Sequence, residues 1–169
     1  MKKIIMMIAL MAVPFAMQAQ VKFHAAEAQE AYGKVKAIKT SVMGQSQTTT
    51  FSEDGKITSP NFSDVVYNAE GYMTSAKVEI MGQKVAISYT WDGGKVIGSS
   101  VDMMGQKVVN TRTYNDKGAA EKETADMGGQ KIEMPYTDYK YDEKGNWISR
   151  KSTMMGQTVE QTRTIEYYE

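Results

Sequence analysis

The chain has 169 residues, with 20 Lys and Arg against 20 Asp and Glu, no Cys and a single His, His24. This length suits one domain with a core of moderate size. The balanced charge excludes the broad basic surface of a nucleic-acid-binding protein. Without Cys the chain can form no disulfide, thiolate nucleophile or Cys-ligated zinc site, and one imidazole cannot supply a centre that needs two.

The first 19 residues have the three-part pattern of a secretory signal peptide. Lys2 and Lys3 form the charged start, residues 4–13 form the apolar run, and Pro14 precedes a cleavage site that ends at the small residue Ala19. The apolar run is about half of the ~20 residues that a membrane-spanning helix needs. We therefore expect cleavage near Ala19 and a product in the periplasm or outside the cell.

Residues 20–169 are predicted to form one domain that does not span a membrane. Residues 24–32 are rich in Ala and Glu and lack β-branched side chains, which favours a short helix. Such a short helix is not stable alone in water, so it must dock on the rest of the domain. The remainder, residues 33–168, is repetitive.

Two series of glycines define the repeat. The first series lies in five turns of similar sequence: Met43-Gly44-Gln45, Met81-Gly82-Gln83, Met104-Gly105-Gln106, Met127-Gly128-Gly129-Gln130 and Met155-Gly156-Gln157. The second series lies between them, at Gly33, Gly71, Gly94, Gly118 and Gly145. Each glycine of the second series lies 11 residues before the glycine that precedes the next Gln, whereas the return segments vary in length. A fixed period with one variable segment is typical of a repeat architecture.

The second kind of turn follows an aromatic residue. Four copies place the aromatic four residues before Gly, and a fifth is one residue shorter: Phe51-Ser52-Glu53-Asp54-Gly55, Tyr67-Asn68-Ala69-Glu70-Gly71, Tyr114-Asn115-Asp116-Lys117-Gly118, Tyr141-Asp142-Glu143-Lys144-Gly145 and Trp91-Asp92-Gly93-Gly94. Asn and Asp side chains can bond their own backbone, and Gly accepts positive φ. Both kinds of turn therefore predict β-hairpins.

The segments between turns are rich in Val, Ile, Thr and Tyr, which favour strands. In one of them Val85, Ile87 and Tyr89 alternate with polar or small residues, a period of two. The predicted fold is therefore all-β, an antiparallel β-meander of about ten to twelve strands. It consists of five hairpin repeats, is open or partly curled, and follows the short helix.

Two places depart from the pattern. Between Gly55 and Gly71 there is no Met-Gly-Gln turn, and Ser59-Pro60-Asn61 takes its place. Pro135 lies in the longest segment, where its missing N–H requires a strand edge or a bulge.

The turn Tyr141-Asp142-Glu143-Lys144-Gly145 and the segment after it resemble the YD repeat of RHS-like proteins, in which Tyr-Asp-x-x-Gly precedes a strand. The turns that end at Gly118 and Gly55 are weaker copies, because Asn or Ser replaces the Asp. The resemblance covers residues 33–168 and implies strand–turn–strand geometry. It implies no activity, since long RHS proteins form cages around toxins and this chain is far too short for a cage.

A second resemblance concerns the sequences Ile80-Met81-Gly82-Gln83-Lys84 and Met103-Met104-Gly105-Gln106-Lys107. With the outline of a sheet plus a helix, they are similar to exported proteins of the lipoprotein-carrier class. That class is a half-open β-barrel that holds acyl chains, and the internal repeat is not part of its pattern. The resemblance implies a curled sheet with an apolar ligand on its inner face.

Methionine is abundant, and seven of the nine residues beyond the signal peptide lie at or beside the repeat turns. Thioethers bind Cu(I), but successive turns of the motif are two strands apart, about 10 Å, too far for three sulfurs to converge. We therefore predict no metal site and no cofactor. The Met-Gly-Gln edge is interpreted as the end of the apolar face or as an adaptable contact surface. The candidate contact residues are Met81, Gln83, Met104, Gln106, Met155, Gln157 and Trp147.

The aromatic residues before the turns could stack on sugars, but a fixed place in every copy is typical of a structural repeat. Trp147 lies outside that series and is the better candidate for ligand contact. Acidic side chains cluster at the turns, as in Glu53-Asp54 and Asp142-Glu143. Turn carboxylates are normally solvated, and a periodic array offers no unique facing pair for hydrolysis. We therefore predict that the protein is not an enzyme.

Two functions follow from these observations. The first is an exported, non-enzymatic binding or scaffold module of the cell envelope, whose weakly apolar sheet face is covered by an envelope protein or by a second copy of the chain in a homodimer. The alternative is a periplasmic carrier whose curled sheet holds a lipid or other apolar small molecule against Val78, Val85, Ile87 and Tyr89. A ligand-filled hollow would distinguish the carrier from the scaffold.

Overall fold

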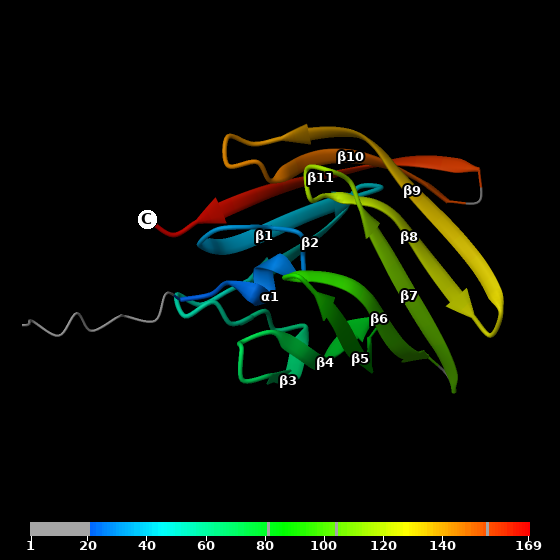
Figure 1. Ribbon diagram of the computed structural model, residues 1–169, viewed down its shortest axis with the longest axis horizontal. Coiled ribbons are helices and arrows are strands. Elements are labelled where there is room, and N and C mark those ends of the chain that lie inside the picture. Colours follow the sequence, from blue (N-terminus) through cyan, green and yellow to red (C-terminus); the bar gives the residue numbers. More distant parts are fainter. Residues whose placement is uncertain (1–20, 81, 104, 155) are drawn as a thin grey trace, which may run out of the picture.

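A computed structural model describes residues 21–80, 82–103, 105–154 and 156–169. These residues form 11 antiparallel strands in a single sheet and one short helix (Figure 1), which confirms the predicted all-β meander. The predicted signal peptide and the candidate residues Met81, Met104 and Met155 lie outside the described residues. The elements are α1 (His24–Glu27), β1 (Val35–Val42), β2 (Gln45–Thr50), β3 (Phe62–Tyr67), β4 (Met73–Ile80), β5 (Gln83–Asp92), β6 (Lys95–Met103), β7 (Gln106–Tyr114), β8 (Ala120–Met127), β9 (Gln130–Tyr141), β10 (Trp147–Met154) and β11 (Gln157–Tyr167).

The Met-Gly-Gln motif forms tight hairpins. In the first copy Val42 pairs with Gln45 across a two-residue loop, and both loop residues, Met43 and Gly44, have positive φ, at 50° and 77°. Positive φ at both central positions defines a type I′ turn, which matches the twist of the flanking strands. The constant spacing of 11 residues between the two series of glycines corresponds to the strand that leads into each of these turns. The strands that leave the turns differ in length, and the longest, β9, has 12 residues.

The aromatic turns depend on a side chain that follows the aromatic residue. Asn115 Oδ1 accepts hydrogen bonds from the amides of Lys117 and Ala119, at 3.0 and 3.1 Å. Asp142 Oδ1 makes the equivalent pair with the amides two and four residues later, and Asn68 does the same. Because only an acceptor oxygen is needed, Asp and Asn serve equally well at this position.

The aromatic side chains before these turns are structural. Trp91 Nε1 donates to the carbonyl of Met73 at 2.7 Å, and the Tyr114 hydroxyl donates to the carbonyl of Val96 at 2.6 Å. In both cases the acceptor lies 18 residues earlier, at the start of a strand. Trp91 and Tyr114 therefore have a structural role, which they perform through hydrogen bonds to the backbone.

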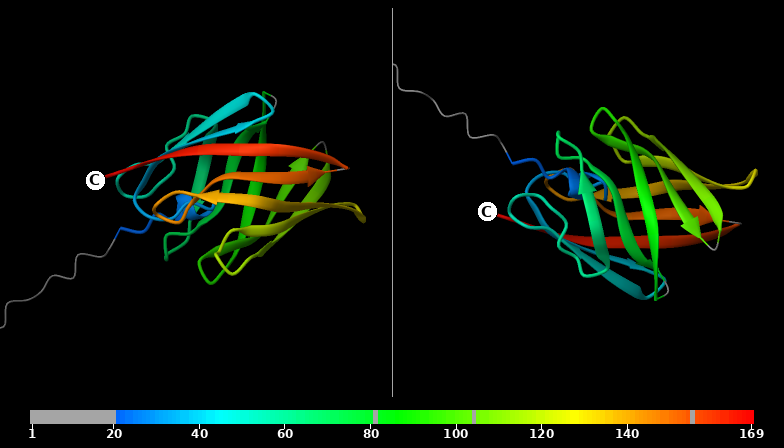
Figure 2. Two further views of the ribbon diagram at one scale, coloured as in Figure 1. Left: turned by 90° about the horizontal axis from the view of Figure 1, so that it is seen from above. Right: turned by 90° about the horizontal axis from the view of Figure 1, so that it is seen from below.

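The strand order is β2-β1-β11-β10-β9-β8-β7-β6-β5-β4-β3. The first long strand, β1, pairs with the last one, β11, with Ile38 opposite Ile165. As a result β2 and β3, which follow each other in the chain, lie at opposite edges of the sheet. Figure 2 shows that the sheet curls strongly, so that these two edges approach each other.

The segment between β2 and β3 joins the two edges, and we call this region the seam. Here the amide of Thr58 donates to the carbonyl of Thr50 at 2.8 Å, on the side of β2. On the other side the carbonyl of Asn61 accepts from the amide of Glu79 at 2.9 Å. The pairing of the described residues includes no direct ladder between β2 and β3, so the sheet does not close. The repeat pattern of the sequence breaks at this crossing.

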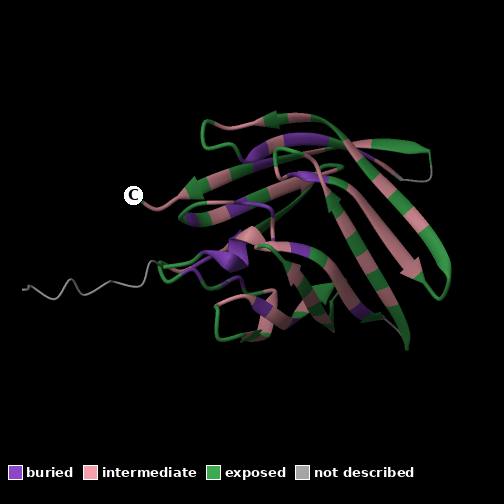
Figure 3. Ribbon diagram, viewed as in Figure 1, coloured by how far each residue is buried: buried purple, intermediate pink, exposed green. Residues whose placement is uncertain are grey.

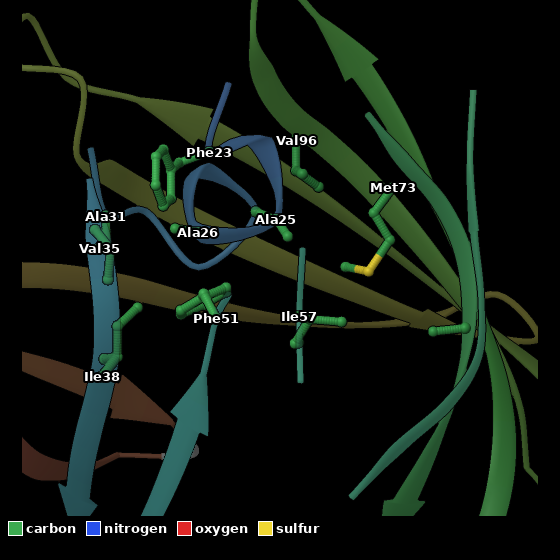
Figure 4. Packing of buried hydrophobic residues seen from close by; sticks show 12 residues of the cluster. Phe23, Ala25, Ala26, Ala31, Val35, Ile38, Phe51, Ile57, Met73 and Val96 are labelled. Atoms are coloured by element: carbon green, nitrogen blue, oxygen red, sulfur yellow. The ribbon is translucent and has the colours of Figure 1, made fainter. Parts of the chain in front are cut away.

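Helix α1 lies inside the curve of the sheet, near the end at which β11 finishes (Figure 1). Buried residues gather around it, whereas the hairpin tips at the far end are exposed (Figure 3). Ala25, Ala26 and Ala31 are fully buried, and Phe51 and Met73 belong to the same core (Figure 4). Small alanine side chains allow the segment to pack close to the strands.

The helix is shorter than the predicted residues 24–32. It ends at Glu27, and Glu30 then adopts a left-handed conformation with φ at 55°. This conformation ends the helical turns and leads the chain toward β1. We refer to residues 23–32, which fill this end of the curled sheet, as the plug.

Pro135 lies in β9, beside Lys122 of β8. On its other side the pairing of β9 with β10 covers only the residues from Tyr136, which follows Pro135, to Tyr141. Residues 130–135 of β9 therefore form a local edge among the described strands. This edge accommodates a residue without an amide donor, as the sequence required.

The first hairpin gives a test of the turn geometry. Met43 has φ at 50° and is 78% exposed, a conformation that costs a non-glycine residue about 1–2 kcal/mol and that Asn tolerates better. Met43→Asn should therefore raise the free energy of unfolding by about 1 kcal/mol in a urea titration. Met127→Asn is the matched control, because Met127 ends β8 as a strand residue and should gain nothing. Equal effects of the two substitutions would contradict the type I′ assignment.

Candidate binding hollow

The curled sheet encloses a hollow between its two ends, with a cavity of about 270 Å³. The residues that line it are Gln29, Thr40, Gln47, Thr49, Phe62, Val78, Ile80, Val85, Ile87, Tyr89 and Val101. All four residues that the carrier hypothesis named, Val78, Val85, Ile87 and Tyr89, are in this set. The structure thus brings together residues that the sequence had singled out only by their alternation.

The hollow has two unlike walls. The apolar wall comes from β3 to β6, where alternate residues such as Val85 and Ile87 are half-buried and their neighbours are exposed. The polar wall comes from β1 and β2 and carries Thr40, Gln47 and Thr49. An apolar surface facing hydroxyl and amide groups suits a ligand that is itself amphipathic.

The seam provides a side opening to the hollow. A groove of about 890 Å³ runs along it, between β2 and the end of β4. Gln47, Val78 and Ile80 line both this groove and the hollow. Because the edges of the sheet do not pair here, a molecule can reach the apolar wall without breaking a β-ladder.

The plug forms the inner end of the hollow, and three charged side chains hold it in place. The carboxylate of Glu30 accepts from the Ala120 amide at 2.8 Å and from Arg150 Nη1 at 2.9 Å. Arg163 donates to the carbonyls of Gln29 and Glu30, at 2.7 and 2.6 Å. These groups are buried, and their mutual contacts compensate for the loss of water.

Asn146 adds a fourth attachment for the plug. Its side-chain oxygen accepts from the Tyr32 amide at 2.8 Å, and its side-chain nitrogen donates to the Tyr32 carbonyl at 2.9 Å. The amide of Asn146 is itself held by Asp142 in the aromatic turn. The turn that most resembles the YD repeat therefore also holds the plug.

Trp147 is a core residue in this structure. It is only 4% exposed, and its ring contacts two guanidinium groups, at 4.1 Å from Arg150 and 3.8 Å from Arg163. Cation–π contacts of this kind orient both arginines toward the plug. Trp147 therefore does not reach the surface together with the other candidate contact residues.

The remaining described candidates, Gln83, Gln106 and Gln157, are exposed and begin β5, β7 and β11. They follow the hairpin loops at the end of the sheet opposite the plug. None of the three lines the hollow. A contact role for this row stays a prediction.

A chain of polar side chains crosses the inner face from β7 to β11. Arg112 Nη2 donates to Glu123 Oε2 at 3.0 Å, and the Tyr136 hydroxyl lies 3.4 Å from the same oxygen. The guanidinium of Arg150 stacks on the Tyr136 ring at 3.8 Å and donates through Nε to Gln161. The sequence analysis did not predict a function for these residues. The alternation of Val108, Asn110 and Arg112 along one strand was the signal that could have placed Arg112 on the inner face.

The buried charges shift the pKa values of their neighbours. Burial alone would raise the pKa of Glu30, but the charges of Arg150 and Arg112, the amide of Ala120 and the charge of Arg163 together hold it below its ordinary value. The Glu30 carboxylate is therefore ionised at neutral pH. On the apolar wall, burial raises the pKa of Tyr89 to about 12.

Within residues 21–80, 82–103, 105–154 and 156–169, no helix has the length and apolarity needed to cross a bilayer. In the same residues no three acidic or His side chains lie close enough together to hold a metal ion. His24 stacks on Tyr72 with ring centres 3.8 Å apart and bonds to Glu27 through Nδ1. It thus belongs to the packing of the plug.

No protein-family model matches the sequence, and no curated protein matches it at a significant level. The resemblances to the YD repeat and to the lipoprotein carriers therefore stay predictions. A function for this chain has to follow from the chemistry of the hollow itself.

The attachment of the plug can be tested through Glu30. Glu30→Gln leaves Arg150 buried without its counter-charge and should lower the free energy of unfolding by about 3 kcal/mol at pH 7. The native pKa of Glu30 is depressed, so its stabilisation is complete above the unfolded pKa of about 4.3 and is lost as the pH falls through the native pKa. The difference between wild type and variant should therefore shrink in acid.

The control for this test is the surface pair Lys122–Glu133, whose side chains are 39% and 60% exposed. Glu133→Gln should change the free energy of unfolding by less than about 1 kcal/mol. Chemical denaturation at two pH values measures both variants. A Glu30→Gln effect no larger than that of the surface pair would show that the buried contacts do not hold the plug.

Proposed function

We propose that the protein is an exported, non-enzymatic binding module that acts as a carrier of an apolar small molecule. The supporting observation is that Val78, Val85, Ile87 and Tyr89 line one cavity in a sheet whose edges do not close. Export rests on the signal-peptide pattern of residues 1–19. Pockets for small molecules are concave and mostly apolar, with a few polar groups that orient the ligand.

The packing of the domain favours this proposal over a rigid scaffold. The fully buried core surrounds the plug at one end, and Phe62, Ile87 and Tyr89 of the hollow pack only against its margin. Several of them, including Phe62 and Ile87, are only half-buried in the protein alone. An apolar ligand would cover this exposed area, and the seam offers it a way in and out.

One specific observation supports the scaffold hypothesis. Met43 is 78% exposed at a turn position where Asn or Gly would be favoured. A residue that is unfavourable for the turn and open to solvent suits contact with a partner protein at the hairpin tips. This contact surface is separate from the hollow and could coexist with carriage of a ligand.

The direct test of carriage is native mass spectrometry of the exported protein, recovered gently from the host envelope. We expect extra mass that organic solvent removes. The same sample should bind the neutral fluorescent probe N-phenyl-1-naphthylamine after extraction. Protein at its bare sequence mass that also fails to bind the probe would overturn the carrier proposal and leave the scaffold.

A pair of substitutions on β5 locates the site. Val85 lines the hollow, whereas its neighbour Ala86 is exposed on the opposite face of the sheet. Val85→Trp should fill the cavity and weaken binding of the probe at least tenfold. Ala86→Trp should leave binding unchanged, and thermal unfolding shows that both variants are folded. Equal probe affinity in the two variants would place the bound probe outside the hollow.

A further inference from the structure

The side chain of Arg112 is available for a role beyond the pairing with Glu123. It lies on the inner face of β7 in line with Val108 and Asn110, and it keeps 20% of its surface exposed. A guanidinium has five N–H donors in a planar fork; Arg112 uses one for the bond to Glu123 at 3.0 Å and also interacts with Tyr114. Such a fork matches the two oxygens of a carboxylate.

Arg112 is not among the residues that line the hollow, but polar residues of β6 and β7 lead from the apolar wall toward it. Tyr89 of the wall pairs in register with Ser99, and Ser99 pairs with Asn110, whose side-chain nitrogen lies 3.3 Å from the Ser99 hydroxyl. Arg112 follows Asn110 on the same face of the strand. The charge of Arg112 also counteracts part of the effect of burial on the pKa of Tyr89, which indicates that the two side chains are near each other.

Three guanidinium groups lie on the inner face of the sheet. Arg112, Arg150 and Arg163 face the carboxylates of Glu30 and Glu123, and Arg163 is held by carbonyl oxygens of the plug. The next acid that acts on Arg163, Asp142, is bound by the amides of its own turn. Buried charges are normally paired, and an anion beside Arg112 would give its guanidinium a further partner.

We propose that the ligand of the hollow is a fatty carboxylate with a single chain, its carboxylate bound by Arg112 and its chain lying on the apolar wall. This inference rests on the proposed carrier function and adds the chemical class of the ligand. One chain, rather than two, follows from the cavity volume of about 270 Å³, which is just below the usual range of small-molecule sites. Ser99 and Asn110 supply polar groups between the wall and the guanidinium.

The experiment compares n-decanoate with n-decanol in displacing N-phenyl-1-naphthylamine from the protein at pH 8, where the carboxylate is ionised. The two ligands have the same chain and differ in the charge of the head group. We expect decanoate to bind at least tenfold more tightly than decanol to the wild type, as a charge-assisted hydrogen bond implies. Arg112→Met should abolish this preference and leave the affinity for decanol unchanged.

Two further variants separate binding from a structural role of Arg112. Glu123→Gln removes the carboxylate that competes for the guanidinium and should strengthen decanoate binding, whereas mere loss of structure would weaken it. Lys107→Met removes a positive charge from the outer face of the same strand and should have no effect. If Arg112→Met does not fold, the Glu123→Gln result decides the proposal.

The outcomes distinguish this inference from the function on which it rests. Equal binding of decanoate and decanol by the wild type would overturn the carboxylate proposal and leave the carrier proposal intact. Failure of both ligands and of the probe to bind would overturn the carrier proposal itself. A decanoate preference that survives Arg112→Met would also overturn the assignment, because another group would then hold the carboxylate.

Discussion

The buried carboxylate of Glu30 joins three parts of the chain that are far apart in sequence. It belongs to the plug, and it binds the first residue of β8 and Arg150 of β10. Removing a carboxylate from water costs several kcal/mol unless its partners are well placed, and here an amide and a guanidinium meet it directly. The sheet can curl because the plug gives its inner face something to pack on.

The repeat made most of the fold predictable. Hairpin turns are local, and residues such as Gly44 and Asn115 identify them because few residues adopt positive φ or bond their own backbone. The alternation of Val85, Ile87 and Tyr89 then indicates which face of a strand is covered. Asp and Asn interchange at the aromatic turns because both offer the same acceptor oxygen. Each of these signals lies within a few residues of sequence.

The strand order and the plug could not be predicted in this way. The pairing of β1 with β11 and the crossing at residues 51–61 join strands whose positions no local pattern specifies. Arg150, Arg163 and Trp147 were equally obscure, because a strand with charged residues usually faces solvent. Here the charges face inward, where the plug supplies carbonyl and carboxylate oxygens. Trp147 was a candidate for ligand contact, but it packs against the two arginines.

The two ends of the sheet have different physical properties, and this difference bears on function. At the plug end, buried alanines, paired charges and turn hydrogen bonds fix the strands in one arrangement. Toward the hairpin tips these contacts are replaced by a cavity and by a seam without a ladder. A domain that only needed stability would gain by closing its edges and filling this space. An open, half-apolar inner face on a firmly held base is instead compatible with the reversible ligand binding that we propose.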